Sequence, residues 1–149
     1  MTVDIYVDGS YNEQRRTYGS GVVIILPDGG APLSLKLAGN TTAYLAHRNI
    51  TGELRAVVLA LDTLYSLEDI DEVNLFYDYA GIEKWVTGEW QAKKPISQGY
   101  VEAMKKFTSR FKINFSKVRA HSGDKYNSLA DKLAREATFL EPEELTGGF

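Results

Sequence analysis

The sequence predicts a single α/β domain, in which a mixed β-sheet carries α-helices on its faces. Apolar side chains first alternate with a period of two and later recur at helical spacing. The predicted order is three strands, a helix, a strand, two helices, a strand and a helix. A meander followed by alternating helices and strands is typical of a mixed sheet. The length of 149 residues matches one domain of common size.

The N-terminal part of the chain predicts three strands. Residues 3–8 alternate apolar and polar side chains, as a half-buried strand does. Residues 19–26 form a second β-rich run, and residues 33–37 alternate again. The turn sequence at 27–30, Pro-Asp-Gly-Gly, separates these two runs and therefore predicts a hairpin after the first strand.

The period then changes to that of a helix. Apolar residues recur at helical spacing from Leu54 to Tyr65 and form one stripe. Asn49 or Thr51 can cap this helix. Either cap puts Glu53 in the first turn, where a carboxylate suits the helix dipole.

The remaining elements alternate between strand and helix. Residues 73–77 predict a buried strand, and residues 81–88 predict a short helix closed by glycine. Then follow a helix marked by Tyr100, Met104, Phe107 and Phe111, a strand over 112–118, and a helix striped by Tyr126, Leu129, Ala130, Leu133, Ala134 and Ala137. We expect one domain over residues 1–140 and a loose acidic tail over 141–149.

Composition excludes several classes of protein. Apolar residues make up 44% of the chain and charged residues 25%, which is unlike a disordered protein. No apolar run approaches the ~20 residues that cross a bilayer, and no secretory signal is visible at the start. The absence of cysteine excludes disulfide scaffolds, thiolate zinc sites and cysteine nucleophiles. We therefore expect a cytoplasmic protein that does not bind membranes.

Charge is distributed unevenly along the chain. The net charge is −3, but residues 84–119 carry nine basic and two acidic side chains. A basic block within an acidic chain allows a polyanionic partner such as a nucleic acid. On charge alone, a solvated helix and strand edge is the favoured explanation of this block.

Four carboxylates are candidates for a common site. Ligands of open α/β sheets lie at the carboxyl ends of strands, where Asp8 is expected to close the first strand and Asp78 the fourth. Glu53 begins the helix between these strands. Asp131 lies on the last helix, with Asn127 one turn before it.

Such a cluster of acids requires cations. Carboxylates around one point repel one another and are costly without a compensating positive charge. Oxygen ligands without cysteine or clustered histidine suit Mg²⁺ or Mn²⁺. Spacing alone does not select these four residues from the 20 acids of the chain.

Sequence motifs around the four acids do select them. In order, they are Asp8-Gly9-Ser10-Tyr11, Gly52-Glu53-Leu54, Tyr77-Asp78, and Ala120-His121-Ser122-Gly123 followed by Asn127-Ser128-Leu129-Ala130-Asp131. Together they resemble a type 1 ribonuclease H, from about Val3 to Ala137. Residues 79–85 and 88–90 are similar to the subgroup whose catalytic domain is often fused to a viroplasmin-like, hybrid-binding domain.

The resemblance implies a fold and an activity. The fold would be ribonuclease H-like, a five-stranded mixed β-sheet flanked by α-helices. The activity would be endonucleolytic hydrolysis of the RNA strand of RNA–DNA hybrids, giving 5′-phosphate and 3′-hydroxyl products. Two Mg²⁺ ions, replaceable by Mn²⁺, would be held by Asp8, Glu53, Asp78 and Asp131. By this analogy Asp8 bridges the ions, and Asp131 completes the site of the ion that activates water.

The resemblance also implies further site residues. His121 would transfer a proton or assist product release. Substrate contacts would come from Gly9, Ser10, Asn49, Trp90, Lys93, Lys94 and Asn127, since a hybrid is recognised by its shape and 2′-hydroxyl groups. Core packing explains Trp85 better, and Trp90 is open to either interpretation. We expect a monomer that needs no protein partner.

The chain also departs from the family pattern in places that concern hybrid binding. Residues 12–17 replace the usual Gly-rich turn, and Ile50 stands where a second asparagine is usual. The long basic protrusion of many members is reduced to residues 88–95.

Two alternatives remain open. Another metal nuclease on this fold, such as a 3′–5′ exonuclease, usually carries a second acid where this chain has Ser10. A non-catalytic hybrid-binding module is the other, and retention of all four acids argues against it.

Overall fold

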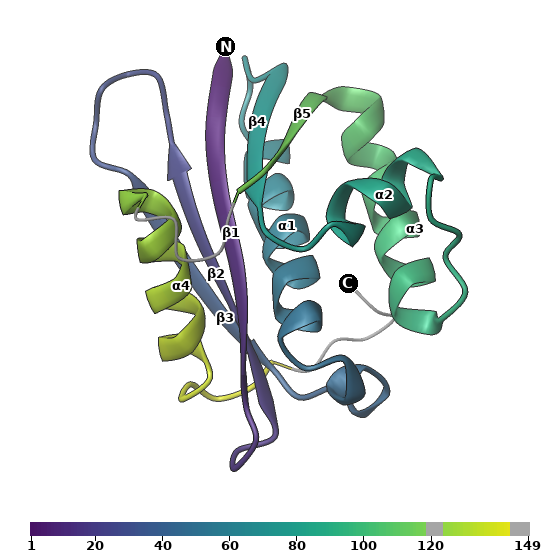
Figure 1. Cartoon of the computed structure of the whole chain (residues 1–149). Coiled ribbons are helices and arrows are strands. Elements are labelled where there is room, and N and C mark those ends of the chain that lie inside the picture. The colour runs from purple at the N-terminus through teal and green to yellow at the C-terminus, as the bar shows by residue number, and fades with distance from the viewer. Residues whose placement is uncertain (119–123, 144–149) are drawn as a thin grey trace.

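The computed structural model describes residues 1–118 and 124–143 (Figure 1). The strands are β1 (Thr2–Asn12), β2 (Thr17–Ile25), β3 (Leu33–Gly39), β4 (Glu72–Tyr77) and β5 (Lys112–Lys117). The helices are the 3₁₀ helix η1 (Thr42–His47) and the α-helices α1 (Asn49–Tyr65), α2 (Gly81–Thr87), α3 (Pro95–Arg110) and α4 (Lys125–Ala137). The order of strands and α-helices is the predicted one, and η1 was not predicted.

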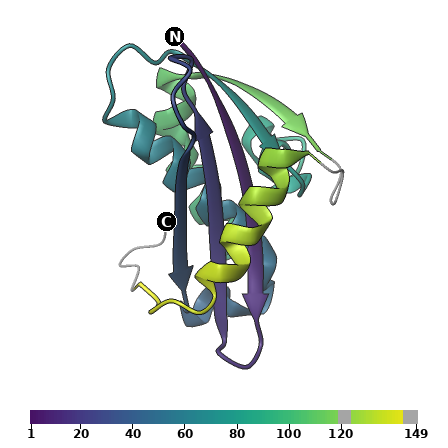
Figure 2. The same cartoon turned by 90° about the vertical axis from the view of Figure 1, so that its left-hand side faces the viewer.

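The five strands form one mixed sheet in the order β3-β2-β1-β4-β5. The β1–β2 and β2–β3 pairs are antiparallel, whereas β1–β4 and β4–β5 are parallel. Helices α1, α2 and α3 cover one face, and α4 lies across the other (Figure 2). The predicted fold class, a five-stranded mixed sheet flanked by helices, is confirmed.

The main core lies between the sheet and α1. Val3, Ile5 and Val7 of β1 are buried there because alternate side chains of a strand point to the same face. The apolar stripe of α1 meets them, and Tyr100, Met104 and Phe107 of α3 extend the core. A smaller cluster of Val23, Ala130 and Leu133 holds α4 on the opposite face. Helices α1 and α4 therefore bury most of the apolar stripes that the sequence predicts, although Tyr65 at the end of the α1 stripe is 38% exposed.

The first strand is longer than predicted. Its antiparallel pairing with β2 continues to Asn12↔Thr17, whereas its parallel pairing with β4 ends at Tyr6↔Phe76. Asp8 therefore lies inside β1 and does not close it, which corrects the prediction. Asp8 still lies just beyond the end of the parallel ladder, so its side chain meets the residues that follow β4.

The start of α1 also differs from the prediction. Arg48 is the N-cap, with φ of 51° and ψ of −125°, and no side chain caps the helix. Asn49 is already helical, and the Thr51 hydroxyl donates to the Tyr44 carbonyl oxygen (2.8 Å). Neither residue is the predicted cap, and Glu53 lies one turn further into the helix.

Two further features concern the ends of the chain and its surface. The backbone N–H of Glu143 donates to the Ala38 carbonyl oxygen (2.9 Å), next to a parallel bridge with Gly39. The division of the chain at residue 140 stays a prediction. Within the described ranges, the structure contains no helix with the length and apolar character that a membrane span requires.

Candidate active site

Three of the four predicted carboxylates line one pocket. Its volume is about 190 Å³, and its walls are Asp8, Gly9, Asn49, Asp78, Asn127, Ser128 and Asp131. Asp8 comes from β1, Asp78 follows β4 directly, and Asp131 projects from α4. Residues far apart in the sequence thus meet at the edge where β1 leaves β4.

Glu53 lies behind this pocket and is only 4% exposed. Its Oε2 atom accepts hydrogen bonds from the backbone N–H groups of Tyr79 (2.8 Å) and Asp78 (3.3 Å). Burial, followed by the negative charges of Asp8 and Asp78, raises the pKa of Glu53 to about 8, although both amide hydrogen bonds oppose this. Glu53 therefore fixes the turn that carries Asp78.

The pKa of Asp8 is raised as well. Burial is the main cause that raises its pKa to about 7, and the charge and hydrogen bond of Asp131 and the charge of Asp78 add to it. The Gly9 N–H donates to Asp8 Oδ1 (2.8 Å) and favours the ionised form. Negative charge is therefore crowded at this point.

Positive charge at the site is scarce. Arg135 pairs with Asp131 at 3.1 Å, one turn along α4. Among residues 1–118 and 124–143, no ion pair reaches Asp8, Glu53 or Asp78. In the described part of the chain, no group of three or more His, Asp or Glu side chains is arranged so that it could hold a metal ion. Glu53 is directed at two backbone amides and Asp131 at Arg135.

The donor atoms nevertheless suit a hard divalent cation. All four acids offer carboxylate oxygens, the ligands that Mg²⁺ and Mn²⁺ prefer. A cation here would also favour the ionised forms of Asp8 and Glu53, which burial and the neighbouring negative charges disfavour. The chemistry of the residues therefore fits the predicted metal ions.

Close backbone packing holds β1 against α1 at this place. A Cβ atom on Gly9 would lie 2.2 Å from the Asn49 carbonyl oxygen and 2.3 Å from the Glu53 nitrogen. A Cβ atom on Gly52 would lie 2.2 Å from the Gly19 carbonyl oxygen. Only glycine fits at both positions, and this contact brings Asp8 next to Glu53.

Sequence reasoning missed several supporting residues. The buried Ser20 hydroxyl donates to the Gly52 carbonyl oxygen (2.7 Å) and ties β2 to α1. Tyr79 supplies the shorter amide bond to Glu53, and Arg135 pairs with Asp131. Of these, only Arg135 carried a signal, since it stands four residues after an acid on a helix.

The predicted substrate-binding residues do not all lie at the carboxylate pocket. Gly9, Asn49 and Asn127 line the carboxylate pocket, whereas Ser10 does not. Lys93 and Lys94 line a separate pocket of about 230 Å³, together with His47, Ile50, Tyr79, Trp85, Gln91, Ile96 and Ser97. His121 lies outside the described residues.

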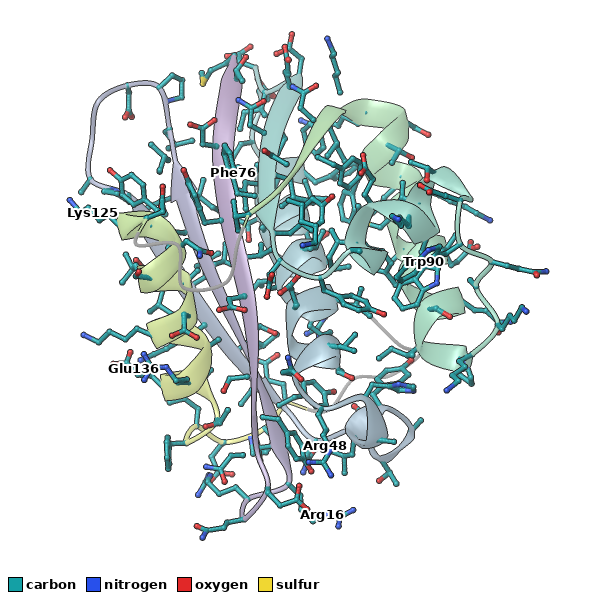
Figure 3. The ribbon with its side chains drawn as sticks, in the orientation of Figure 1. Arg16, Arg48, Phe76, Trp90, Lys125 and Glu136 are labelled. Carbon is teal, nitrogen blue, oxygen red and sulfur yellow. The ribbon has the colours of Figure 1, made fainter. Side chains whose placement is uncertain are left out.

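Trp90 belongs to an aromatic cluster on the α2–α3 side (Figure 3). Its ring is 37% exposed and lies 5.8 Å from the Trp85 ring and 6.1 Å from the Tyr79 ring. The Lys84 ammonium lies 5.5 Å from the Trp90 ring. Trp85 is half-buried against the core, in agreement with the packing role expected for it.

Comparisons with known proteins agree on one family. The RNase H family model matches residues 1–139. Ribonuclease H of Vibrio campbellii is 31% identical, over 97% of this chain and 95% of that protein. Ribonuclease HI of Vibrio parahaemolyticus is 30% identical, with the same two shares covered.

Solved structures share the fold. RNase H1 from Halobacterium salinarum superposes with a TM-score of 0.74 at 23% identity, over 92% of this chain and 97% of that chain. The N-terminal RNase H domain of a Mycobacterium tuberculosis protein superposes with a TM-score of 0.75 at 24% identity, over 92% of this chain and 93% of that chain. LC11-RNase H1, solved in complex with an RNA/DNA hybrid, superposes with a TM-score of 0.72 at 22% identity, over 91% of this chain and 96% of that chain.

Proposed function

Because the chain belongs to the ribonuclease H family, we propose that it is an endonuclease that hydrolyses the RNA strand of RNA–DNA hybrids. The products would carry 5′-phosphate and 3′-hydroxyl ends. The fold neighbour solved with an RNA/DNA hybrid is consistent with such a substrate.

The observation that carries this proposal is the pocket of three aspartates backed by buried Glu53. Asp8, Glu53, Asp78 and Asp131 would hold two Mg²⁺ ions, or Mn²⁺ in their place. Two such ions, when bound, activate the attacking water and stabilise charge on the phosphate and the leaving oxygen. The subgroup with a viroplasmin-like partner domain stays a prediction.

The remaining pocket residues would bind and orient the hybrid. Asn49, Asn127 and Ser128 place amide and hydroxyl groups beside the carboxylates, where they can hydrogen-bond to the backbone and 2′-hydroxyls of RNA. Gly9 and Ser10 would contribute close backbone contacts. His121 would move a proton during cleavage or assist product release.

The DNA strand would lie towards α2 and α3. Lys93 and Lys94 are exposed and can contact its phosphates, and the exposed edge of Trp90 can pack against its sugars. These residues lie outside the carboxylate pocket, so they would contribute to affinity and leave the chemical step to the acids.

A gel assay tests the proposal. One labelled RNA strand is presented as RNA–DNA hybrid, as RNA duplex and as single strand, with Mg²⁺, with Mn²⁺ and with a chelator. We expect internal cleavage of the hybrid alone, and only with metal. Binding of the hybrid without cleavage would instead support a non-catalytic module, and shortening from the 3′ end would support an exonuclease.

Two variants locate the site. Asp8→Asn should lose cleavage by orders of magnitude and remain folded, because it keeps the Gly9 hydrogen bond but loses a charge. Asp4→Asn is the matched control: it makes the same change on β1, where Asp4 accepts a hydrogen bond from Asn74 (2.9 Å) outside the pocket. Cleavage by Asp8→Asn at the rate of Asp4→Asn would refute the site.

A further inference from the structure

A second and larger pocket lies between α1 and α3, and it shares no residue with the carboxylate pocket. Its volume is about 620 Å³, within the range of roughly 300–1,000 Å³ that is usual for small-molecule sites. Val58, Leu59, Ala103 and Phe107 give it an apolar wall. The proposed nuclease activity makes no use of it.

Arg55 of α1 is the unusual residue of this pocket. It is only 8% exposed, yet it makes no hydrogen bond and no ion pair with any residue in the described ranges. Burial lowers the pKa of its guanidinium. Buried arginines normally satisfy their five N–H donors with acceptors, because an unpaired buried charge is costly.

The other charges of the pocket are already engaged. Lys106 pairs with Asp62 at 3.2 Å, and Lys105 pairs with Glu102 at 2.7 Å. Glu143 is exposed at the rim and lies beyond ion-pair distance of Arg55. Arg55 is therefore the pocket cation without an ion pair among the described residues, although the charges of Glu143 and Asp62 act on it from a distance.

A second polar group near Arg55 also lacks a partner. The Tyr18 hydroxyl is buried, and within the described part of the chain nothing hydrogen-bonds to it. It lies within electrostatic reach of the Arg55 guanidinium. Buried polar groups without partners are rare. Tyr18 itself does not line the pocket, so an anion in the pocket would pair with Arg55 rather than with Tyr18.

We propose that this pocket binds a small organic monocarboxylate, whose carboxylate pairs with Arg55 and whose apolar body lies against Val58, Ala103 and Phe107. Arginine matches the geometry of a carboxylate with two parallel N–H bonds. A single negative charge fits better than a doubly charged phosphate, because the carboxylate of Glu143 remains at the rim.

Calorimetric titration with 4-phenylbutyrate and its uncharged amide tests this proposal. The two probes have the same shape and differ in charge. The wild-type protein should prefer the acid by about tenfold or more, because charge-assisted hydrogen bonds discriminate strongly against neutral groups. Equal binding of acid and amide, or no binding of either at millimolar concentration, would overturn the proposal.

Variants assign the preference to one residue. Arg55→Met keeps the bulk of the side chain and should abolish the preference for the acid, and Arg55→Gln serves if the first variant does not fold. Lys105→Met removes a charge from the same pocket, but from an exposed and paired side chain, and should keep the preference. An Arg55 variant that still prefers the acid would contradict the assignment.

Thermal unfolding without any probe gives an independent readout. Arg55→Met should melt at a higher temperature than the wild type, because it removes a buried charge that has no ion pair among the described residues. A lower melting temperature would show that the guanidinium already has an anionic partner, and this result too would overturn the proposal.

Discussion

In the presence of a chelator, the stability of the protein should fall as the pH rises from about 6.5 to 9. Asp8 and Glu53 have pKa values of about 7 and about 8 in the folded chain, against 3.8 and 4.5 as ordinary values. At any pH between the ordinary pKa and the folded pKa of each group, the folded state binds more protons than the unfolded state. Stability therefore decreases with pH, and the loss is complete once both folded groups have ionised.

The size of the effect follows from the two pKa values. At about 1.4 kcal/mol per pKa unit, they correspond to a loss of about 3 kcal/mol between about pH 6.5 and pH 9. Asp8 is only partly buried, so solvent screening reduces its share, and we expect about 2 kcal/mol, or roughly 4–8 °C in melting temperature. Burial lowers the pKa of His47, which gives the opposite slope, but only below its ordinary value of 6.5.

Urea unfolding followed by tryptophan fluorescence measures this loss at several pH values. Glu53→Gln should remove the larger share of the slope, because Glu53 has the higher pKa. Asp4→Asn should keep the full slope. A wild-type stability that stays level or rises from pH 6.5 to 9 in chelator would refute the reasoning, as would an unchanged slope in Glu53→Gln.

Three further predictions follow from the site. Millimolar Mg²⁺ should raise the melting temperature of the wild type at pH 9 by mass action but not that of Asp8→Asn, as differential scanning fluorimetry can show; an equal shift in both would argue against a site at Asp8. Gly9→Ala should lower the free energy of unfolding in urea by about 3 kcal/mol or more, because the new Cβ would lie 2.2 Å from a carbonyl oxygen. The control Gly30→Ala should cost little, because the nearest atom to its Cβ is a side-chain oxygen at 3.1 Å. In cleavage assays at increasing salt, KM for the hybrid should rise less steeply in the double variant Lys93→Gln, Lys94→Gln than in the wild type, with kcat unchanged; parallel salt profiles would remove these lysines from the interface.

The sequence was sufficient to locate most elements, because their patterns are local. The alternation in residues 3–8 identified β1, and the stripe from Leu54 identified α1. The predicted end of β1 was wrong because the length of this strand depends on its pairing with β2, which no local pattern encodes. The predicted start of α1 was wrong because the N-cap, Arg48, has a positive φ. Residues other than glycine seldom adopt this conformation, so no residue pattern predicts it there.

The acids of the candidate site could be selected from the sequence, but the backbone groups and side chains that hold them in place could not. Asp8, Asp78 and Asp131 line one pocket, as the motifs imply, although their roles stay predictions. The contacts of Glu53 with the Tyr79 and Asp78 amides join residues far apart in the sequence, and backbone groups leave no trace in residue type.

The mixed pairing of β1 also has a consequence for the order of folding. Its antiparallel partner β2 follows within a few residues, but its parallel pairing joins Thr2 to Glu72 and must close a long loop first. Proteins rich in such distant pairings fold slowly. We expect the β1–β2–β3 meander to form early and β4 and β5 to join late, so that destabilising changes in β5 speed unfolding more than they slow folding.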